Sequence, residues 1–123
     1  MKRVISGILT TVVLASTPVV GMAQEEKPET KEQVVEGFCE AHAKFAALVM
    51  KMRQAEMPIT EVLTMVEKNF SENLQGITKH LVRTAYSKPL YSSKEYKERS
   101  VIEFSNATYL ECYEHLIKLE MGE

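Results

Sequence analysis

Three histidines, His42, His80 and His115, are the side chains best suited to moving a proton at neutral pH. Catalysis by a nucleophile requires a serine, cysteine or threonine held beside a histidine and an orienting group. The three histidines fall on three different expected helices, and no recognisable motif surrounds them. His42 shares an apolar helical face with Cys39 and Phe45, which is typical of a hydrogen-bonded core histidine. We therefore expect no catalytic residue and no enzyme.

Glutamates are the second group that could act chemically. Glu36, Glu40, Glu111 and Glu114 could approach one another near one end of the fold, and paired carboxylates cleave glycosidic bonds in many enzymes. Such chemistry also needs a sugar-binding cleft, which a helical domain of this size rarely supplies. Carboxylates at helical spacing are more often a solvated face, and this is the role that we expect here.

Methionines are concentrated in one part of the chain, at Met50, Met52, Met57 and Met65. Thioethers are soft ligands for Cu(I), so methionine-based copper binding is a weak functional alternative. Met50 and Met52, however, are two residues apart on an expected helix and point in different directions. The other two methionines lie beyond the end of that helix. Methionine as an adaptable core residue is the better explanation, and we expect no metal and no cofactor.

Two cysteines, Cys39 and Cys112, predict one disulfide bond. In an oxidising compartment an even number of cysteines favours pairing, and only one intramolecular pairing is available. Neither cysteine belongs to a C-x-x-C motif of the kind that supports redox chemistry. A reactive pair and an intermolecular pair remain as alternatives to the structural bridge.

The N-terminus has the form of a secretory signal. Residues 1–3 give a basic start, residues 4–20 form an uncharged and mostly apolar run, and small residues precede the expected cleavage after Ala23. A membrane span needs about 20 apolar residues, whereas this run is interrupted by serine, threonine and proline. We therefore expect residues 1–23 to be removed, no stable membrane insertion afterwards, and a location in the periplasm or outside the cell.

The remaining chain is expected to form a flexible tail over residues 24–30 and one helical domain over residues 31–123. After loss of the signal, 13 basic residues stand against 17 acidic ones, a formal charge of −4. Nucleic-acid binding needs clustered lysine and arginine, so we expect no nucleic-acid partner. All the acidic residues are glutamate, which favours helix interiors, whereas aspartate favours caps and turns.

Apolar periodicity predicts four helices. The first should run over residues 31–54 after a capping box at Thr30, and a short second helix should begin with Thr60 as its cap and end near residues 69–71. The third should cover residues 72–86, and Ser92 or Ser93 should cap a fourth helix that continues to the C-terminus. The inward faces of the first and third helices are expected to include, among others, Phe38, Leu74, Ile77 and Leu81.

Together these elements predict an all-α fold, a small up-down four-helix bundle with two long outer helices and two short inner ones. Short connections would bring the start of the first helix and the end of the last to the same pole. Cys39 and Cys112 lie at those ends, so topology and cysteine placement agree. The inner pair is about half as long as the outer pair and should cover only part of it.

The opposite pole, where two turns should meet, is rich in aromatic and apolar residues for a loop region. The residues expected there are Arg53, Met57, Tyr86, Leu90 and Tyr91. Tyrosine, arginine and methionine are enriched where proteins bind proteins, so this pole is a candidate partner-binding surface. Alternatively, its tyrosines close the end of the core.

These features favour a small exported, non-enzymatic binding protein of the bacterial envelope that acts through a protein partner. In format, as a small exported helical chain with one disulfide, the protein is similar to the acid-stress chaperones of the bacterial periplasm. That similarity implies a second function, a stress chaperone whose bundle loosens in acid as its glutamates lose their charge and exposes apolar inner faces.

Overall fold

Four helices make up the part of the chain that the structure, a computed structural model, describes, residues 27–122. No strand occurs in that range, and the all-α prediction is confirmed. The predicted signal, residues 1–23, and the start of the predicted tail lie outside the described residues. The helices, in chain order, are α1 (Lys31–Gln54), α2 (Ile59–Asn69), α3 (Glu72–Tyr86) and α4 (Lys94–Met121).

The helix ends follow the capping chemistry of the sequence at three places. The Thr30 hydroxyl accepts from the Gln33 main-chain N–H at 3.2 Å while the Gln33 side chain accepts from the Thr30 N–H at 2.9 Å, which is the predicted capping box. Ser93 caps α4 by accepting from the Tyr96 N–H at 3.2 Å. At the other end of α4, Gly122 adopts a left-handed conformation with φ 71°.

The prediction that Thr60 caps α2 is wrong. The cap residue is Pro58, and the helix begins at Ile59, so Thr60 lies inside the first turn. The Pro58 carbonyl accepts from the main-chain N–H groups of Glu61 and Val62. Proline has a fixed φ suited to a helix start and no N–H of its own to satisfy, and α2 begins here without a side-chain cap.

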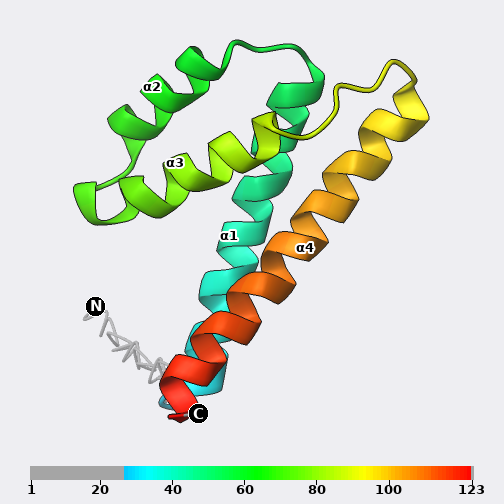
Figure 1. Cartoon of the computed structure of the whole chain (residues 1–123). Helices are drawn as coiled ribbons and strands as arrows, with labels where there is room; N and C mark the ends of the chain where they lie inside the picture. The colour runs from blue at the N-terminus through cyan, green and yellow to red at the C-terminus, as the bar shows by residue number, and fades with distance from the viewer. Residues whose placement is uncertain (1–26, 123) are drawn as a thin grey trace, which may run out of the picture.

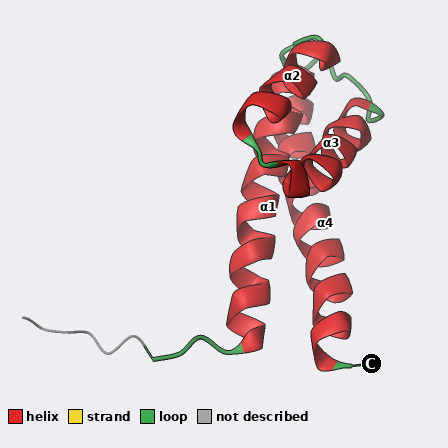
Figure 2. Ribbon diagram, turned by 90° about the vertical axis from the view of Figure 1, so that its left-hand side faces the viewer, coloured by secondary structure: helices red, strands yellow, loops and turns green. Residues whose placement is uncertain are grey.

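The two long helices and the two short helices form separate pairs. Figure 1 shows α1 and α4 side by side, with α2 and α3 as a short hairpin at one end. Viewed from the side, in Figure 2, the short pair crosses the upper part of the long pair, and the lower part consists of α1 and α4 alone. The predicted division into two long and two short helices, with partial cover, is therefore confirmed. No helix within residues 27–122 combines the length and hydropathy that a membrane crossing requires.

The hydrophobic core lies beneath the short pair. It joins residues from all four helices: Ala46, Val49, Met50, Val62, Val66, Leu81, Val82, Ala85 and Phe104. Several residues that the apolar pattern assigns to inward faces stay outside it, since Phe38, Leu74 and Ile77 are each about 40% exposed. The cause is the oblique position of the short pair: α3 packs on α1 and α2 and has little contact with α4.

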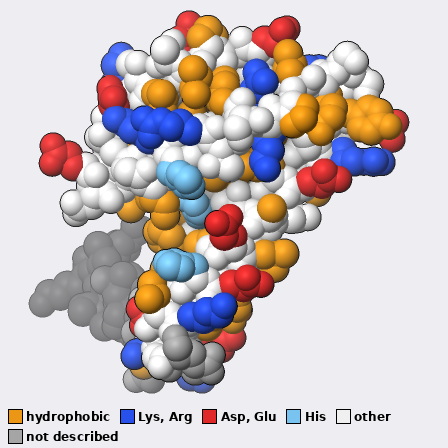
Figure 3. Space-filling view, in the orientation of Figure 1, with side chains coloured by type: hydrophobic (Ala, Val, Ile, Leu, Met, Phe, Trp, Pro, Cys, Tyr) orange, Lys and Arg blue, Asp and Glu red, His pale blue; other side chains and the backbone are white. Residues whose placement is uncertain are grey.

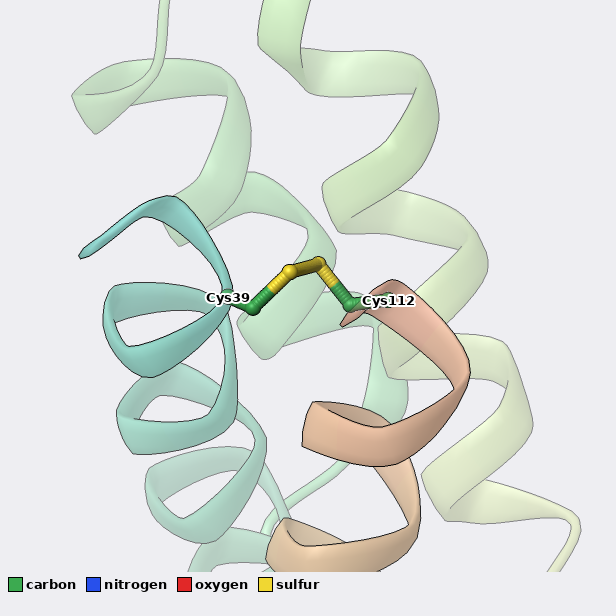
Figure 4. Close-up of a disulfide and its surroundings, with 2 residues drawn as sticks. All are labelled: Cys39 and Cys112. Carbon is green, nitrogen blue, oxygen red and sulfur yellow. A yellow bond between two sulfur atoms is a disulfide. The ribbon is translucent and has the colours of Figure 1, made fainter. Parts of the chain in front are cut away.

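The Cys39–Cys112 disulfide joins α1 to α4 (Figure 4), and its cysteines lie in the first half of α1 and the second half of α4. The two Cα atoms are 5.6 Å apart, and Cys39 is fully buried. The intramolecular bridge is therefore confirmed. Nearby, the Tyr113 hydroxyl donates to the Glu32 carboxylate at 3.1 Å, and Val35 is buried between the two helices.

Removing the bridge should cost much of the stability of the fold. With a sequence separation of 73 residues, the chain-entropy model gives a contribution on the order of 4 kcal/mol. We expect the double variant Cys39→Ser, Cys112→Ser to lose about that amount in its free energy of unfolding, measured by urea denaturation. A loss below about 1 kcal/mol would show that α1 and α4 hold together without the covalent link.

Candidate functional site

A groove of about 640 Å³ lies between α3 and α4, with α1 as its floor. Nine positions of α4 between Ser100 and Leu116 line it, and they recur every three or four residues. Four positions of α3 between Ile77 and Thr84 follow the same spacing. The groove is therefore bounded by one face of α3 and one face of α4, and these two helices have little contact with each other.

Apolar side chains form most of the interior of the groove. Met50, Leu81 and Phe104 lie almost completely buried at its base, and Phe38 and Ile77 stand at its sides with about two fifths of their surface exposed. Sequence reasoning missed this site because a helical pattern reports which face is apolar and not whether a neighbour covers it. The signal that was present is the predicted inward position of Phe38 and Ile77.

All the histidines of the chain, His42, His80 and His115, line this one groove although they come from three different helices. In Figure 3 the pale blue histidine side chains gather on this face, beside apolar and acidic side chains. Within residues 27–122 no three histidine, cysteine or glutamate side chains are placed so that they could hold a metal ion. The three imidazoles therefore share the surface of this groove.

His42 was expected in the core, and the structure places it half-buried on the groove instead. Its ring stacks on Phe38, with the ring centroids 6.1 Å apart and the planes 14° from parallel. Burial lowers the pKa of His42 below its usual 6.5, and the negative charge of Glu111 opposes this shift. The folded protein thus favours the neutral imidazole.

A lowered pKa at His42 makes stability fall as the solution becomes acidic. Above about pH 6.5 the imidazole is neutral in both the folded and the unfolded states, so it does not change the free energy of unfolding. Below that pH the unfolded state binds the proton first, and this lowers the free energy of unfolding. We expect the free energy of unfolding, measured by urea denaturation, to fall between pH 7.5 and 5. The fall should be smaller in His42→Gln than in the wild type.

The matched control for this pH series is His80→Gln, because His80 lines the same groove but is exposed. That variant should keep the wild-type dependence on pH. If His42→Gln loses as much stability as the wild type over this range, burial of His42 does not govern the acid response.

The residues predicted for the aromatic pole do come together. The Arg53 side chain donates from Nε and Nη2 to the Lys88 carbonyl at 3.3 and 3.2 Å, and its guanidinium lies 5.5 Å from the centre of the Tyr86 ring. The Tyr86 hydroxyl donates to the Met57 carbonyl at 2.6 Å. The polar groups of Arg53 and Tyr86 are thus used within the protein, where they tie the two turns to each other.

Gln54 is the central residue of this pole, and sequence reasoning did not select it. Its side chain is buried, donates to the Pro89 carbonyl at 2.9 Å and accepts from the Tyr91 N–H at 3.0 Å. Its own carbonyl accepts from Lys97 Nζ at 2.8 Å. The local sequence does not indicate that this polar residue at a helix end is buried, because its hydrogen-bond partners lie 35 to 43 positions further along the chain.

Two apolar members of the predicted pole remain available to solvent. Met57 and Leu90 are exposed, whereas Tyr91 is half-buried and stacks on Tyr96 with ring centroids 6.0 Å apart. The hydrogen bonds favour closure of the core end as the role of this pole. Partner contact at Met57 and Leu90 stays a prediction.

The methionines occupy different environments. Met50 is buried and its sulfur accepts a hydrogen bond from the Gln54 amide at 3.6 Å, while Met52 and Met65 pack partly buried against the core. Met57 is exposed on the turn between α1 and α2. Three of the four therefore fill space in or against the core, which supports methionine as a packing residue.

The four glutamates considered for acid–base chemistry, Glu36, Glu40, Glu111 and Glu114, are all exposed. A hydrogen bond and ion pair with Lys44 at 2.8 Å lower the pKa of Glu40. Glu111 differs from the others because it lines the groove. These positions are those of a solvated face, as expected, with one member placed at the candidate site.

No protein-family model, curated protein or solved structure matches this chain.

Proposed function

We propose that this protein is an exported, non-enzymatic binding protein of the bacterial envelope, and that it takes an apolar segment of a protein partner into the groove between α3 and α4. The observation that carries the proposal is the exposure of Phe38 and Ile77 beside that groove. Side chains of this kind normally lie in a core, and here the fold gives them a concave surface without a covering helix.

The free energy available at such a surface is sufficient for specific binding. Completing the burial of a large apolar side chain is worth about 1.5–3 kcal/mol relative to full exposure, so two half-exposed side chains and their partners supply several kcal/mol. The base of the groove is formed by buried, well-packed residues such as Met50 and Phe104. A partner would therefore meet a preformed surface and would not have to order it on binding.

The proposed location rests on the sequence and on the disulfide. The N-terminal segment has the pattern of a secretory signal, and a disulfide in a chain of this size is compatible with an exported protein. A location in the periplasm follows from our interpretation of the signal as bacterial. The protein would then meet its partner in an oxidising compartment, where the Cys39–Cys112 bridge persists.

The stress-chaperone function remains the second candidate, and one observation favours it. The lower part of the molecule consists of two helices and holds few buried residues besides Val35 and Cys39. Such a region opens more readily than the core beneath the short pair. A chaperone would hold many clients weakly, whereas a dedicated binding protein would hold one.

Affinity capture from envelope extract tests the proposal when it is combined with a groove variant. The bait is the mature, disulfide-bonded protein, and captured proteins are identified by mass spectrometry. We expect one stoichiometric partner with the wild type and at least about a tenfold loss with Ile77→Glu, because the new charge would be buried in the contact.

The matched control is Leu110→Glu, since Leu110 is an exposed apolar residue of α4 that does not line the groove. Capture by this variant should equal that of the wild type, and thermal unfolding of both variants should verify that they fold. Equal capture by Ile77→Glu would refute the groove as the binding surface. Many weak partners, bound best in acid, would favour the chaperone.

A further inference from the structure

The charged groups of the groove are unevenly distributed. Glu103 and Glu111 line its α4 side, and within residues 27–122 neither forms an ion pair, since the four observed pairs use other residues. From Ser100 to Ile117, α4 carries three glutamates and no lysine or arginine. Among the described residues that line the groove, Lys88 is the one lysine or arginine. The α4 wall is therefore negative over more than four turns of helix.

The geometry of the groove suits a helix. Its α4 side extends from Ser100 to Leu116, about 24 Å at the rise of an α-helix, which is the length of a segment of about 16 residues. Both walls present side chains at intervals of three and four residues, so their ridges can take the ridges of a third helix. Within the described residues there is no strand edge with which an extended peptide could pair.

The two carboxylates set a spacing for the occupant. Glu103 and Glu111 are eight residues apart on the same face of α4, about 12 Å along its axis. Two basic residues separated by two helical turns on a neighbouring helix would match that distance. We propose that the occupant of the groove is a cationic amphipathic helix, an inference that rests on the proposed function. The apolar face of this helix fills the groove, and its lysine or arginine side chains meet Glu103 and Glu111.

The histidines give this interaction a dependence on pH. Facing the groove are His42 from α1, His80 from α3, Lys88 and Tyr91 from the turn before α4, and Glu103, Glu111 and His115 from α4; α2 contributes none. With neutral imidazoles, one ammonium stands against two carboxylates, a formal charge of −1. Each imidazole that gains a proton adds one positive charge to the groove. A cationic helix is therefore attracted at neutral pH and held more weakly as the solution becomes acidic.

Three matched peptides test the partner chemistry. Each is a fluorescently labelled helical peptide of about 18 residues with the same leucine face, and two positions a further two turns apart carry lysine, glutamine or glutamate. Binding to the mature, disulfide-bonded protein is measured by fluorescence anisotropy at pH 7.5. We expect the lysine peptide to bind about tenfold more tightly than the glutamate peptide, with the glutamine peptide between them.

Charge variants of the protein identify the carboxylates that are responsible. The double variant Glu103→Gln, Glu111→Gln should abolish the preference for lysine. The matched control, Glu95→Gln with Glu98→Gln, removes two exposed glutamates of α4 outside the groove and should keep the preference. At pH 5 the wild type should bind the lysine peptide at least about threefold more weakly than at pH 7.5.

The outcomes separate this inference from the proposed function. Equal binding of the three peptides, lost in Ile77→Glu, would overturn the cationic partner and leave the groove as a binding surface. Binding that Ile77→Glu does not change would count against the groove itself. Failure of the lysine peptide to bind, or unchanged affinity at pH 5, would also overturn the inference.

Discussion

The disulfide between Cys39 and Cys112 is the constraint on which the rest of the arrangement depends. It joins the lower parts of α1 and α4, where few side chains besides Val35 and Cys39 are buried, so packing alone offers little to keep those ends together. With those ends joined, the short pair does not have to cover the whole of the long pair. The covalent link thereby permits an open groove in a chain this small, because the stability that a further covering helix would provide is replaced by a restriction of the unfolded state.

The groove and the aromatic pole represent two different uses of residues that are typical of interfaces. At the pole, Arg53 and Tyr86 direct their polar groups into the two turns, and the buried Gln54 satisfies both a carbonyl and an N–H of the segment before α4. In the groove, by contrast, Ile77 and Phe38 present apolar surface to solvent, and Glu103 and Glu111 form no ion pair within the described chain. An unused contact surface, and not residue type alone, distinguishes a candidate binding site.

Sequence reasoning predicted the helices, three of the four helix starts and the disulfide, because capping boxes, proline and apolar spacing act over a few residues. It placed Thr60 instead of Pro58 at the start of α2 and His42 in the core. It also failed to find the groove. That site depends on the angle at which the short pair crosses the long pair, and no local pattern encodes this angle. For the same reason, the spacing of the three histidines in the sequence does not predict that they line one groove.

Site-specific photo-crosslinking in intact cells tests the central claim most directly. A photoreactive amino acid would replace Ala107, which lines the groove, and, in a second strain, Leu110, which lies three residues further along α4 and outside the groove. Both side chains are exposed, so both can accept the probe without disturbing the core. The proposal predicts a covalent adduct with one partner protein from position 107 and none from position 110. An adduct from position 110 alone would place the contact surface outside the residues that line the groove and would contradict the proposal.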